Sequence, residues 1–526
     1  MAQEPKRAPH LPSHQEDRLW QWVERYVQPR VDWRKHGRML EQSYDPIVPM
    51  KVGNRRALAR GGHGTHWREG GSKRTNLLKG NITRLGTRND MSTDISRIAE
   101  LAKEDPKRQF YSIAHLITSE KLHEAFRSLR KDASAGIDGV TYEQYETNVE
   151  ENIRQLHQRL KEGKYQAQPL RRVYIPKEDG KQRPISIPAL EDKIAQKAVV
   201  DLLNAIYEQD FLDCSYGFRP KRGQHQALDE VGRVICTRPI EWVLEIDIRS
   251  YFDSIVRSAL VGMIEKRVTD GSVLRLIGKW IKVGVIEDGR LLVSETGTGQ
   301  GQPISPLLAN LYLHGVLDEW FESEVKPRLR GEAYEIRFAD DAILCFQHKE
   351  DAEKVLKVLP KRFEKYGLTL HPEKTRLIEF GRYADKNARK QGKKPATFNF
   401  LGFVHICARS RRGKFTVHVK TVAKRLARGL KAVWEWCQRH RHDPVSEQQK
   451  TLNAKLRGHY QYYGRRTNYR AMQQFYTRVR RIWREWLSRR TRGKQLTWER
   501  FAEILRQYPL LPPRITQAWA GAGSHA

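Results

Sequence analysis

Cysteine is scarce in this chain, with five residues among 526. They are far apart and form neither a CxxC pair nor a spacing typical of zinc ligands. The sequence therefore predicts no disulfide framework and no zinc site. We expect the cysteines to be reduced packing residues, at Cys214, Cys236, Cys345, Cys407 and Cys437.

Long apolar runs are also missing. No stretch approaches the roughly 20 apolar residues that a helix needs to cross a bilayer. The first residues, MAQEPKRAPHLPSHQEDRLW, contain no apolar segment that could act as a secretory signal. The sequence therefore predicts neither membrane insertion nor export, and we expect the protein in the cytoplasm.

Acidic residues are too few to balance the basic ones. The chain has 62 Asp and Glu against 96 Lys and Arg, which gives a formal net charge of +34. An excess beyond what solubility requires indicates a polyanionic partner. A membrane surface could attract the same charge, but the charge is spread along the whole chain and no membrane span is predicted. Nucleic acid is therefore the favoured partner.

No internal repeat is evident, and local composition divides the chain into four segments. The apolar residues of 1–50 suffice for a short helix, whereas 51–92 are rich in Gly, Arg, Lys, Asn and Thr and predict a flexible basic arm. Helical and strand patterns are mixed over 93–405, and in the last segment, 406–526, strand signals largely vanish from Val422 onward and long basic helices are predicted. We therefore expect an α+β body followed by a helical carboxyl-terminal region.

Two compact strand signals carry acidic residues. Asp247 lies inside the predicted apolar strand WVLEIDI, and the strands IRFA and AILCF flank Asp340 and Asp341. An unpaired carboxylate within an apolar strand costs several kcal/mol, so Asp247 requires a cation nearby. Asp340 and Asp341 fall at the tight end of a predicted hairpin, without the Gly or Asn that ordinary two-residue turns favour.

Three carboxylates on neighbouring strands repel one another unless divalent cations lie between them. Phosphoryl transfer uses such an arrangement, in which two Mg²⁺ ions roughly 4 Å apart activate a 3′-hydroxyl and stabilise charge at a phosphate. The alternative is structural: Asp340 and Asp341 form a solvated turn, and Asp247 pairs with a local base such as Arg249.

Other segments favour the first interpretation. Phe252 lies five residues after Asp247, where a ring beside an incoming sugar would collide with a 2′-hydroxyl. Gln300 lies in a glycine-rich loop, 297–306, whose backbone could approach a nucleotide closely. Three evenly spaced cations surround a predicted hairpin and could face a triphosphate: Arg171, Lys177 and Arg183. Taken singly, a core Phe, a helix-entry loop and a solvated basic face explain them equally well.

The carboxyl-terminal region mixes aromatic residues with arginines. Phe475, Val479, Ile482 and Trp486 follow a helical period and predict one buried stripe, with most arginines away from it. Structured RNA is recognised through backbone charge, shape and stacking, which such a surface suits. An amphipathic helix with a solvated face is the structural alternative.

Taken in order, these motifs resemble the reverse transcriptases encoded by bacterial group II introns. The resemblance covers roughly residues 109–515 and includes AGIDGVTYEQY, RRVYIPKEDGKQRPISIPALEDKIAQKAV, FLDCSYGFRPKRGQHQAL, EIDIRSYFDSI, GTGQGQPISPLLANLYL, IRFADDAILCF, GLTLHPEKT and FNFLGF. The joint pattern is far more specific than any single motif. It departs from the family at Phe338, where Tyr is common, and at Gly299 and Gln302, where Pro and Gly often occur.

The resemblance implies a role for each matching position. Asp247, Asp340 and Asp341 would be the catalytic carboxylates, and these three with Ile248 would form the site of two Mg²⁺ ions. Phe252 would select the sugar. The other residues implied to contact the nucleotide are Arg171, Lys177, Arg183, Gln300 and Lys374.

The resemblance also implies a fold and partners. It predicts a right-hand polymerase, with fingers and palm over 93–405 and an all-helical thumb and maturase domain over 406–526. Its partners would be group II intron RNA or another RNA template, a DNA primer or target, and deoxynucleotides. No cysteine and histidine cluster resembling an HNH endonuclease follows, so we expect no endonuclease activity. A related polymerase that serves DNA repair or phage defence without splicing is the alternative.

Overall fold

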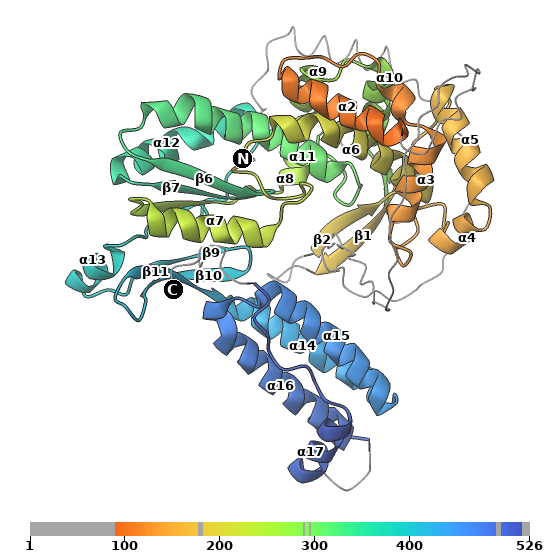
Figure 1. Cartoon of the computed structure of the whole chain (residues 1–526). Coiled ribbons are helices and arrows are strands. Elements are labelled where there is room, and N and C mark those ends of the chain that lie inside the picture. Colours follow the sequence, from red (N-terminus) through yellow and green to blue (C-terminus); the bar gives the residue numbers. More distant parts are fainter. Residues whose placement is uncertain (1–89, 177–181, 288–289, 294–295, 491–495, 518–526) are drawn as a thin grey trace, which may run out of the picture.

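A computed structural model describes residues 90–176, 182–287, 290–293, 296–490 and 496–517. Figure 1 shows a body of helices and sheets from which a bundle of helices projects. The short helix predicted within residues 1–50, nearly all of the basic arm predicted for 51–92, and Lys177 lie outside the described residues. The last residues of that arm already belong to helix α2, Asp90–Glu104.

The first part of the described chain is mainly helical. A threonine hydroxyl accepts a backbone hydrogen bond at the start of α3 and of α4, and the start of α4 is a capping box between Thr141 and Gln144. These helices surround α6, which is buried on several sides and contains the helix predicted around residues 190–207. The helices are α3 Ser119–Ser128, α4 Tyr142–Glu146, α5 Val149–Lys161 and α6 Leu190–Asp210.

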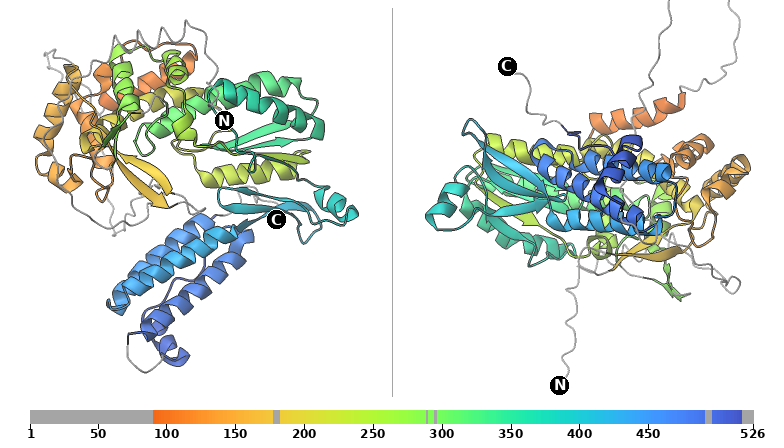
Figure 2. Two further views of the ribbon diagram at one scale, coloured as in Figure 1. Left: turned by 180° about the vertical axis from the view of Figure 1, so that it is seen from behind. Right: turned by 90° about the horizontal axis from the view of Figure 1, so that it is seen from below.

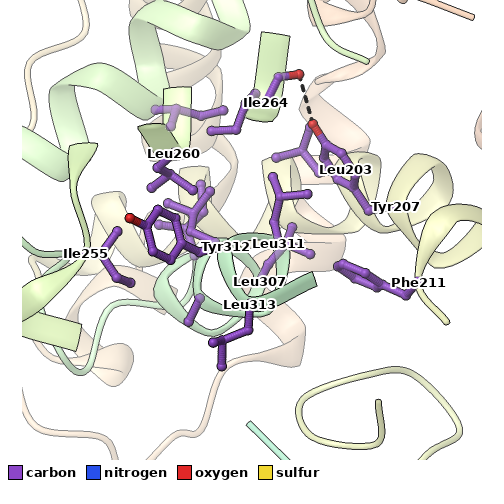
Figure 3. Packing of buried hydrophobic residues seen from close by; sticks show 14 of the residues in the cluster. Leu203, Tyr207, Phe211, Ile255, Leu260, Ile264, Leu307, Leu311, Tyr312 and Leu313 are labelled. Carbon is purple, nitrogen blue, oxygen red and sulfur yellow. Dashed lines mark hydrogen bonds between the residues drawn. The ribbon is translucent and has the colours of Figure 1, made fainter. Parts of the chain in front are cut away.

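A second group of helices packs against α6. The apolar side chains of α6, α9 and α11 interdigitate, and the buried Tyr207 hydroxyl donates to the Ile264 carbonyl at 3.2 Å (Figure 3). Because a buried hydroxyl needs a partner, this bond satisfies Tyr207 inside an otherwise apolar core. The helices of this group are α8 Tyr251–Ser254, α9 Arg257–Glu265, α10 Gly271–Lys282 and α11 Ser305–Leu313.

The predicted hairpin around Arg171 and Arg183 is confirmed. Strands β1, Leu170–Pro176, and β2, Gln182–Ile187, pair antiparallel. The short strands β4, Val285–Glu287, and β5, Arg290–Leu292, extend this sheet in the order β2-β1-β4-β5. We call it the hairpin sheet.

A second sheet, here called the central sheet, has the order β6-β7-β3-β8. Helix α12, Lys349–Lys365, and helix α7, Gln224–Thr237, cover its opposite faces (Figure 1). Two buried faces explain why most residues of β3 and β7 are apolar. The strands are β3 Trp242–Ile246, β6 Ala333–Phe338, β7 Asp341–Phe346 and β8 Arg376–Glu379.

The third sheet corrects the predicted domain boundary. Strands β9, Thr397–Phe400, β10, Phe403–Arg409, and β11, Phe415–Thr421, pair antiparallel and share an apolar core with the central sheet. The predicted boundary at 405/406 therefore falls inside β10, and the region 406–526 is not all-helical. Strand β11 buries alternate side chains, and the exposed His418 and Lys420 lie between its buried positions.

Helices begin only at Ala423. The α14–α16 bundle extends away from the sheets, as Figure 1 and the left view of Figure 2 show. In the predicted stripe on α16, Phe475, Val479 and Trp486 are buried and Ile482 is half-buried against the same core, while the adjacent Trp483 is also fully buried. The helices are α14 Ala423–Arg439, α15 Val445–Tyr463, α16 Tyr469–Ser488 and α17 Trp498–Gln507. Within the described residues, no helix combines the length and apolarity needed to cross a membrane.

A buried histidine in the third sheet predicts acid sensitivity. The His405 ring is fully buried and stacks on Phe398 at 4.5 Å between centroids. Burial, with the positive charge of Arg465, lowers the pKa of His405 to about 3. The unfolded chain binds the proton near the ordinary pKa of about 6.5, so stability from the neutral ring is lost as pH falls from about 6.5 to about 3.

We therefore expect His405→Phe to lose less stability than the wild type between pH 7 and pH 5. Phenylalanine keeps the ring stacked on Phe398 but binds no proton. Urea unfolding midpoints at the two pH values measure the effect. Equal midpoint shifts in the two proteins would contradict it.

Candidate active site

Three carboxylates meet at one end of the central sheet. Strands β3 and β7 pair antiparallel up to the Ile246–Ala342 pair, so Asp247 and Asp341 lie opposite each other one step further along. Asp340 is in the two-residue turn between β6 and β7, which pair up to Phe338 and Asp341. The hairpin predicted around Asp340 and Asp341 is thus confirmed. Residues almost a hundred positions apart are brought together by strand pairing.

The turn that holds Asp340 is strained. Ala339 has a φ of +56°, a conformation that a residue with a side chain adopts at a cost. The loop that contains Gly217, between α6 and α7, packs directly against this turn, since a Cβ atom on Gly217 would lie 2.3 Å from the Ala339 nitrogen. Strain of this kind persists only where surrounding contacts impose it, and such positions are common at functional sites.

A buried ion pair is hydrogen-bonded to this turn. Arg337 and Asp318 are both fully buried and form a bidentate pair, with one N–O distance of 2.7 Å. Arg337 also donates to the Ala339 carbonyl at 3.0 Å and to the Asn310 side-chain oxygen at 3.1 Å. The Asn310 amide in turn donates to the Gly217 carbonyl at 2.6 Å. The conformation of the turn is therefore held by a continuous polar network.

The site accumulates negative charge. Displacement of water by surrounding protein, together with the charges of Asp340 and Asp247, raises the pKa of Asp341 to about 7, although part of its side chain reaches solvent. Burial and the charge of Asp247 likewise raise the pKa of Asp340. Carboxylates destabilised in this way provide a favourable environment for cations.

A single lysine pairs with Asp247. The Lys374 ammonium lies 3.1 and 3.3 Å from the two Asp247 carboxylate oxygens, which is the cation that the sequence required. The contact is made by Lys374 and not by Arg249, the partner suggested from the sequence. Lys374 follows a sharp turn after α12, where residue 371 donates its N–H to the Asp247 carbonyl at 2.8 Å.

The carboxylates open into a recess, here called the acidic recess. It is lined by Asp247, Asp341, Glu373, Lys374, Asn399 and Arg425. Arg425, near the start of α14, lowers the pKa of Asp341 by its charge. Sequence reasoning missed Arg425, because it is one of many basic residues and only the fold brings α14 to the carboxylates. It also missed Arg337, although a charged residue in an apolar strand was a usable signal.

The glycine-rich loop lies beside Phe252. The Thr298 N–H donates to the Phe252 carbonyl at 2.9 Å, and the Gly297 N–H donates to the Ile255 carbonyl at 2.9 Å. Gly297 has a φ of +83° and would bring a Cβ atom within 2.9 Å of Asp253. Glycine is therefore required where the loop contacts α8. The half-buried Phe252 ring packs on the edge of the main core.

The predicted nucleotide contacts have different environments. The Gln300 carbonyl accepts from the Ser186 N–H at 2.7 Å, so the loop is joined to β2. Arg183 on β2 is exposed, and its charge lowers the pKa of Asp340. Arg171 is half-buried and donates to the Ala135 carbonyl at 2.8 and 3.1 Å. The charge of Arg183 therefore acts on the site, whereas Arg171 already has a backbone partner.

The donor set fits magnesium. Carboxylate oxygens are ligands that Mg²⁺ prefers, and the site holds three carboxylates, two of them with raised pKa values. The Ile248 side chain is buried in the core, so only its backbone carbonyl could bind a cation. Ile248 itself lies in an isolated bridge with Leu370. The chemistry of these groups matches the cation predicted from the sequence.

Comparison with known proteins places this site in a family. Residues 175–405 match the family model for reverse transcriptase (RNA-dependent DNA polymerase). The chain is 31% identical over 303 residues to the group II intron-encoded protein LtrA of Lactococcus lactis subsp. cremoris, which covers 55% of this chain and 50% of LtrA. The chain thus spans half the length of that relative.

Two further relatives show how far the similarity extends. Protein YkfC of Escherichia coli (strain K12) is 32% identical over 371 residues, covering 64% of this chain and 93% of YkfC. An uncharacterized 91 kDa protein in a cob intron of Schizosaccharomyces pombe is 31% identical over 241 residues, covering 44% of this chain and 29% of that protein. With the family match and the near-complete coverage of YkfC, the chain belongs to the reverse transcriptase family, in the group that includes group II intron-encoded proteins.

Proposed function

We propose that this protein is an RNA-directed DNA polymerase that extends a primer 3′-hydroxyl with deoxynucleotides. The meeting of Asp247, Asp340 and Asp341 at one end of the central sheet supports this proposal most strongly. The hairpin sheet would form the fingers, and the central and third sheets the palm. Helices α14–α17 would form the thumb and maturase domain, which moves its start from residue 406 to about residue 423.

The three carboxylates would hold two Mg²⁺ ions, with the Ile248 carbonyl as a further ligand. When bound, the ions would lower the pKa of the primer hydroxyl, stabilise charge at the α-phosphate and bind the leaving pyrophosphate. The chain contributes a preorganised site: the Arg337 network holds the turn of Asp340 before any substrate arrives.

Cations around the carboxylates would position the triphosphate. The charge of Arg183 on β2 lowers the pKa of Asp340, and Lys374 pairs with Asp247. Charge-assisted hydrogen bonds from such groups orient phosphates and offset their repulsion by the acidic side chains. Arg171 and Lys177 belong to the same proposed set, together with Gln300 in the loop that joins β2.

The helical region would bind structured RNA, including group II intron RNA. On α16, Arg478 and Arg481 are exposed, and their side chains line a shallow groove with the α14 residues Leu430 and Trp434. Positive charge beside an aromatic surface suits the RNA backbone and unstacked bases. LtrA is a group II intron-encoded protein, which is consistent with assistance to splicing. A repair or defence polymerase without a splicing role is the alternative.

A primer-extension assay tests the proposal. Purified full-length protein is supplied with an RNA or a DNA template, a DNA primer, Mg²⁺, and either deoxynucleotides or ribonucleotides. We expect DNA synthesis on the RNA template that stops when the metal is chelated. Synthesis from ribonucleotides alone, or no synthesis on any template, would reject it. Added intron RNA that splices faster with the protein than without it would distinguish a maturase from the alternative.

We expect Phe252→Ala to admit ribonucleotides. Removal of the ring removes the proposed collision with the 2′-hydroxyl, so discrimination between the two sugars should fall by roughly tenfold or more. The ratio of kcat/KM for a deoxynucleotide and its ribonucleotide measures the effect. Phe252→Tyr keeps the ring and serves as the control. Unchanged discrimination in Phe252→Ala would show that the ring is only a packing residue.

A further inference from the structure

The loop 297–306 contains a glutamine that behaves unlike its neighbours. Gln302 is 2% exposed, although it lies in a loop between two exposed or half-buried residues. Its side-chain oxygen accepts from the Gln196 amide of α6 at 2.8 Å. Its amide donates to the Trp280 carbonyl of α10 at 3.3 Å. One side chain therefore connects the loop to two helices of the main core.

Space for this amide depends on Gly299. A Cβ atom at position 299 would lie 2.8 Å from the Gln302 amide nitrogen and 2.7 Å from a methyl group of Leu170. Leu170 is buried at the start of β1. The absence of a side chain at position 299 therefore allows Gln302 to fold back beneath the loop.

Gln300 lies between Gly299 and a second constrained glycine. Gly301 has a φ of +118°, and a Cβ atom there would lie 2.7 Å from the Ser186 carbonyl oxygen. The Gln300 carbonyl accepts from the N–H of that same Ser186. With β2 bonded to Gln300 and the Gln302 amide fixed from below, the backbone on both sides of Gln300 is held.

We propose that Gln302, through its bond with Gln196, is a positioning residue that sets how the loop presents Gln300 to the incoming nucleotide. This inference rests on the proposed function, because it takes the loop to border the nucleotide. Gln302 does not contact the nucleotide itself. Its loss should therefore weaken nucleotide binding through loop displacement and leave the carboxylates intact.

A double-mutant cycle can test the hydrogen bond between Gln196 and Gln302. Replacing one of two paired buried amides leaves the other without its partner, whereas replacing both with apolar groups removes the unpaired group as well. Gln302→Leu and Gln196→Leu should each raise the KM for deoxynucleotide by roughly five- to tenfold, the effect of losing about one buried hydrogen bond. The double variant should be little worse than either single variant.

Two controls separate positioning from general destabilisation. Gln448 is an equally buried glutamine in the helical bundle, where it accepts from the Trp483 indole at 2.9 Å. Gln448→Leu should lower the melting temperature with no change in the KM for deoxynucleotide. If Gln302→Leu fails to fold, Gly299→Ala tests the same hydrogen bond, because its methyl group would displace the Gln302 amide. Gly262→Ala, on an exposed position of α9 with open space around it, is the matched glycine control.

The experiment compares steady-state primer extension and thermal unfolding in all six variants. A raised KM in Gln302→Leu, Gln196→Leu and Gly299→Ala, without one in Gln448→Leu and Gly262→Ala, supports the inference. A KM equal to that of the wild type in the first three, or singles whose effects simply add, overturns it. An inactive wild type would instead reject the proposed function, and the two failures are thereby distinguished.

Discussion

Asp340→Ala is expected to abolish Mg²⁺-dependent primer extension while leaving RNA binding nearly intact. The carboxylate lies in the turn between β6 and β7, where its charge adds to those of Asp341 and Asp247. Loss of a proposed metal ligand removes several kcal/mol of transition-state stabilisation, so the rate should fall by roughly a thousandfold or more. RNA binding should persist, because it depends mainly on basic surfaces elsewhere.

Single-turnover extension and filter binding of labelled RNA measure the two properties separately. Asp132→Ala is the control, because this exposed carboxylate pairs only with the neighbouring Arg130 and lies outside the acidic recess. It should extend primers at the wild-type rate. A wild-type rate in Asp340→Ala would remove Asp340 from the catalytic site, and an equal loss of RNA binding would indicate misfolding.

Arg337→Met is expected to lower both stability and activity. Arg337 and Asp318 are fully buried, so removal of one partner leaves a buried charge without its bidentate counterpart. Such losses cost about 3–5 kcal/mol of unfolding free energy. The Ala339 carbonyl also loses the hydrogen bond that holds the strained turn. Extension measured well below the unfolding temperature should therefore fall even among folded molecules. Urea unfolding followed by tryptophan fluorescence measures the stability.

The double variant Arg337→Met/Asp318→Leu separates the two effects. Replacing both members of a buried ion pair by apolar residues is often nearly neutral, so much of the stability should return. Activity should stay low, because the contact with Ala339 remains absent. Glu353→Ala breaks the exposed Lys349 pair and should cost less than about 1 kcal/mol. Recovery of activity with stability in the double variant would contradict a role for Arg337 in holding the turn.

Local pattern predicted much of the fold. A polar turn between two strand patterns identified the hairpin of β1 and β2, and two compact apolar strands on either side of Asp340 and Asp341 identified the hairpin of β6 and β7. The apolar run also identified strand β3, although the strand ends at Ile246, before Asp247, and not at Ile248 as predicted. Because these elements depend on residues that are close together in the chain, a single sequence is enough to predict them. The same reasoning named no strand at β10 or β11, although β11 buries alternate side chains.

In the active site, too, some residues were predictable from the sequence, whereas their contacts depended on the fold. Asp247, Asp340 and Asp341 were identifiable because a carboxylate in or beside an apolar strand is costly without a partner. Lys374 was suggested by resemblance, but its contact with Asp247 depends on a β-bridge between distant segments, Ile248 with Leu370. The Asp318 partner of Arg337 is 19 residues away on a different element. Gln196 and Gln302 are 106 residues apart, and no local pattern links them.

By itself, the sequence determined which chemical groups this protein has, the excess of positive charge, and the short-range elements that carry the carboxylates. The tertiary structure alone decided which cation meets each acid, which buried network holds the Ala339 turn, and where the body ends and the helical bundle begins. The physical reason is the range of the interactions. Periodicity and turn preference act over a few residues, whereas ion pairing and burial depend on the packing of segments that are remote in the chain.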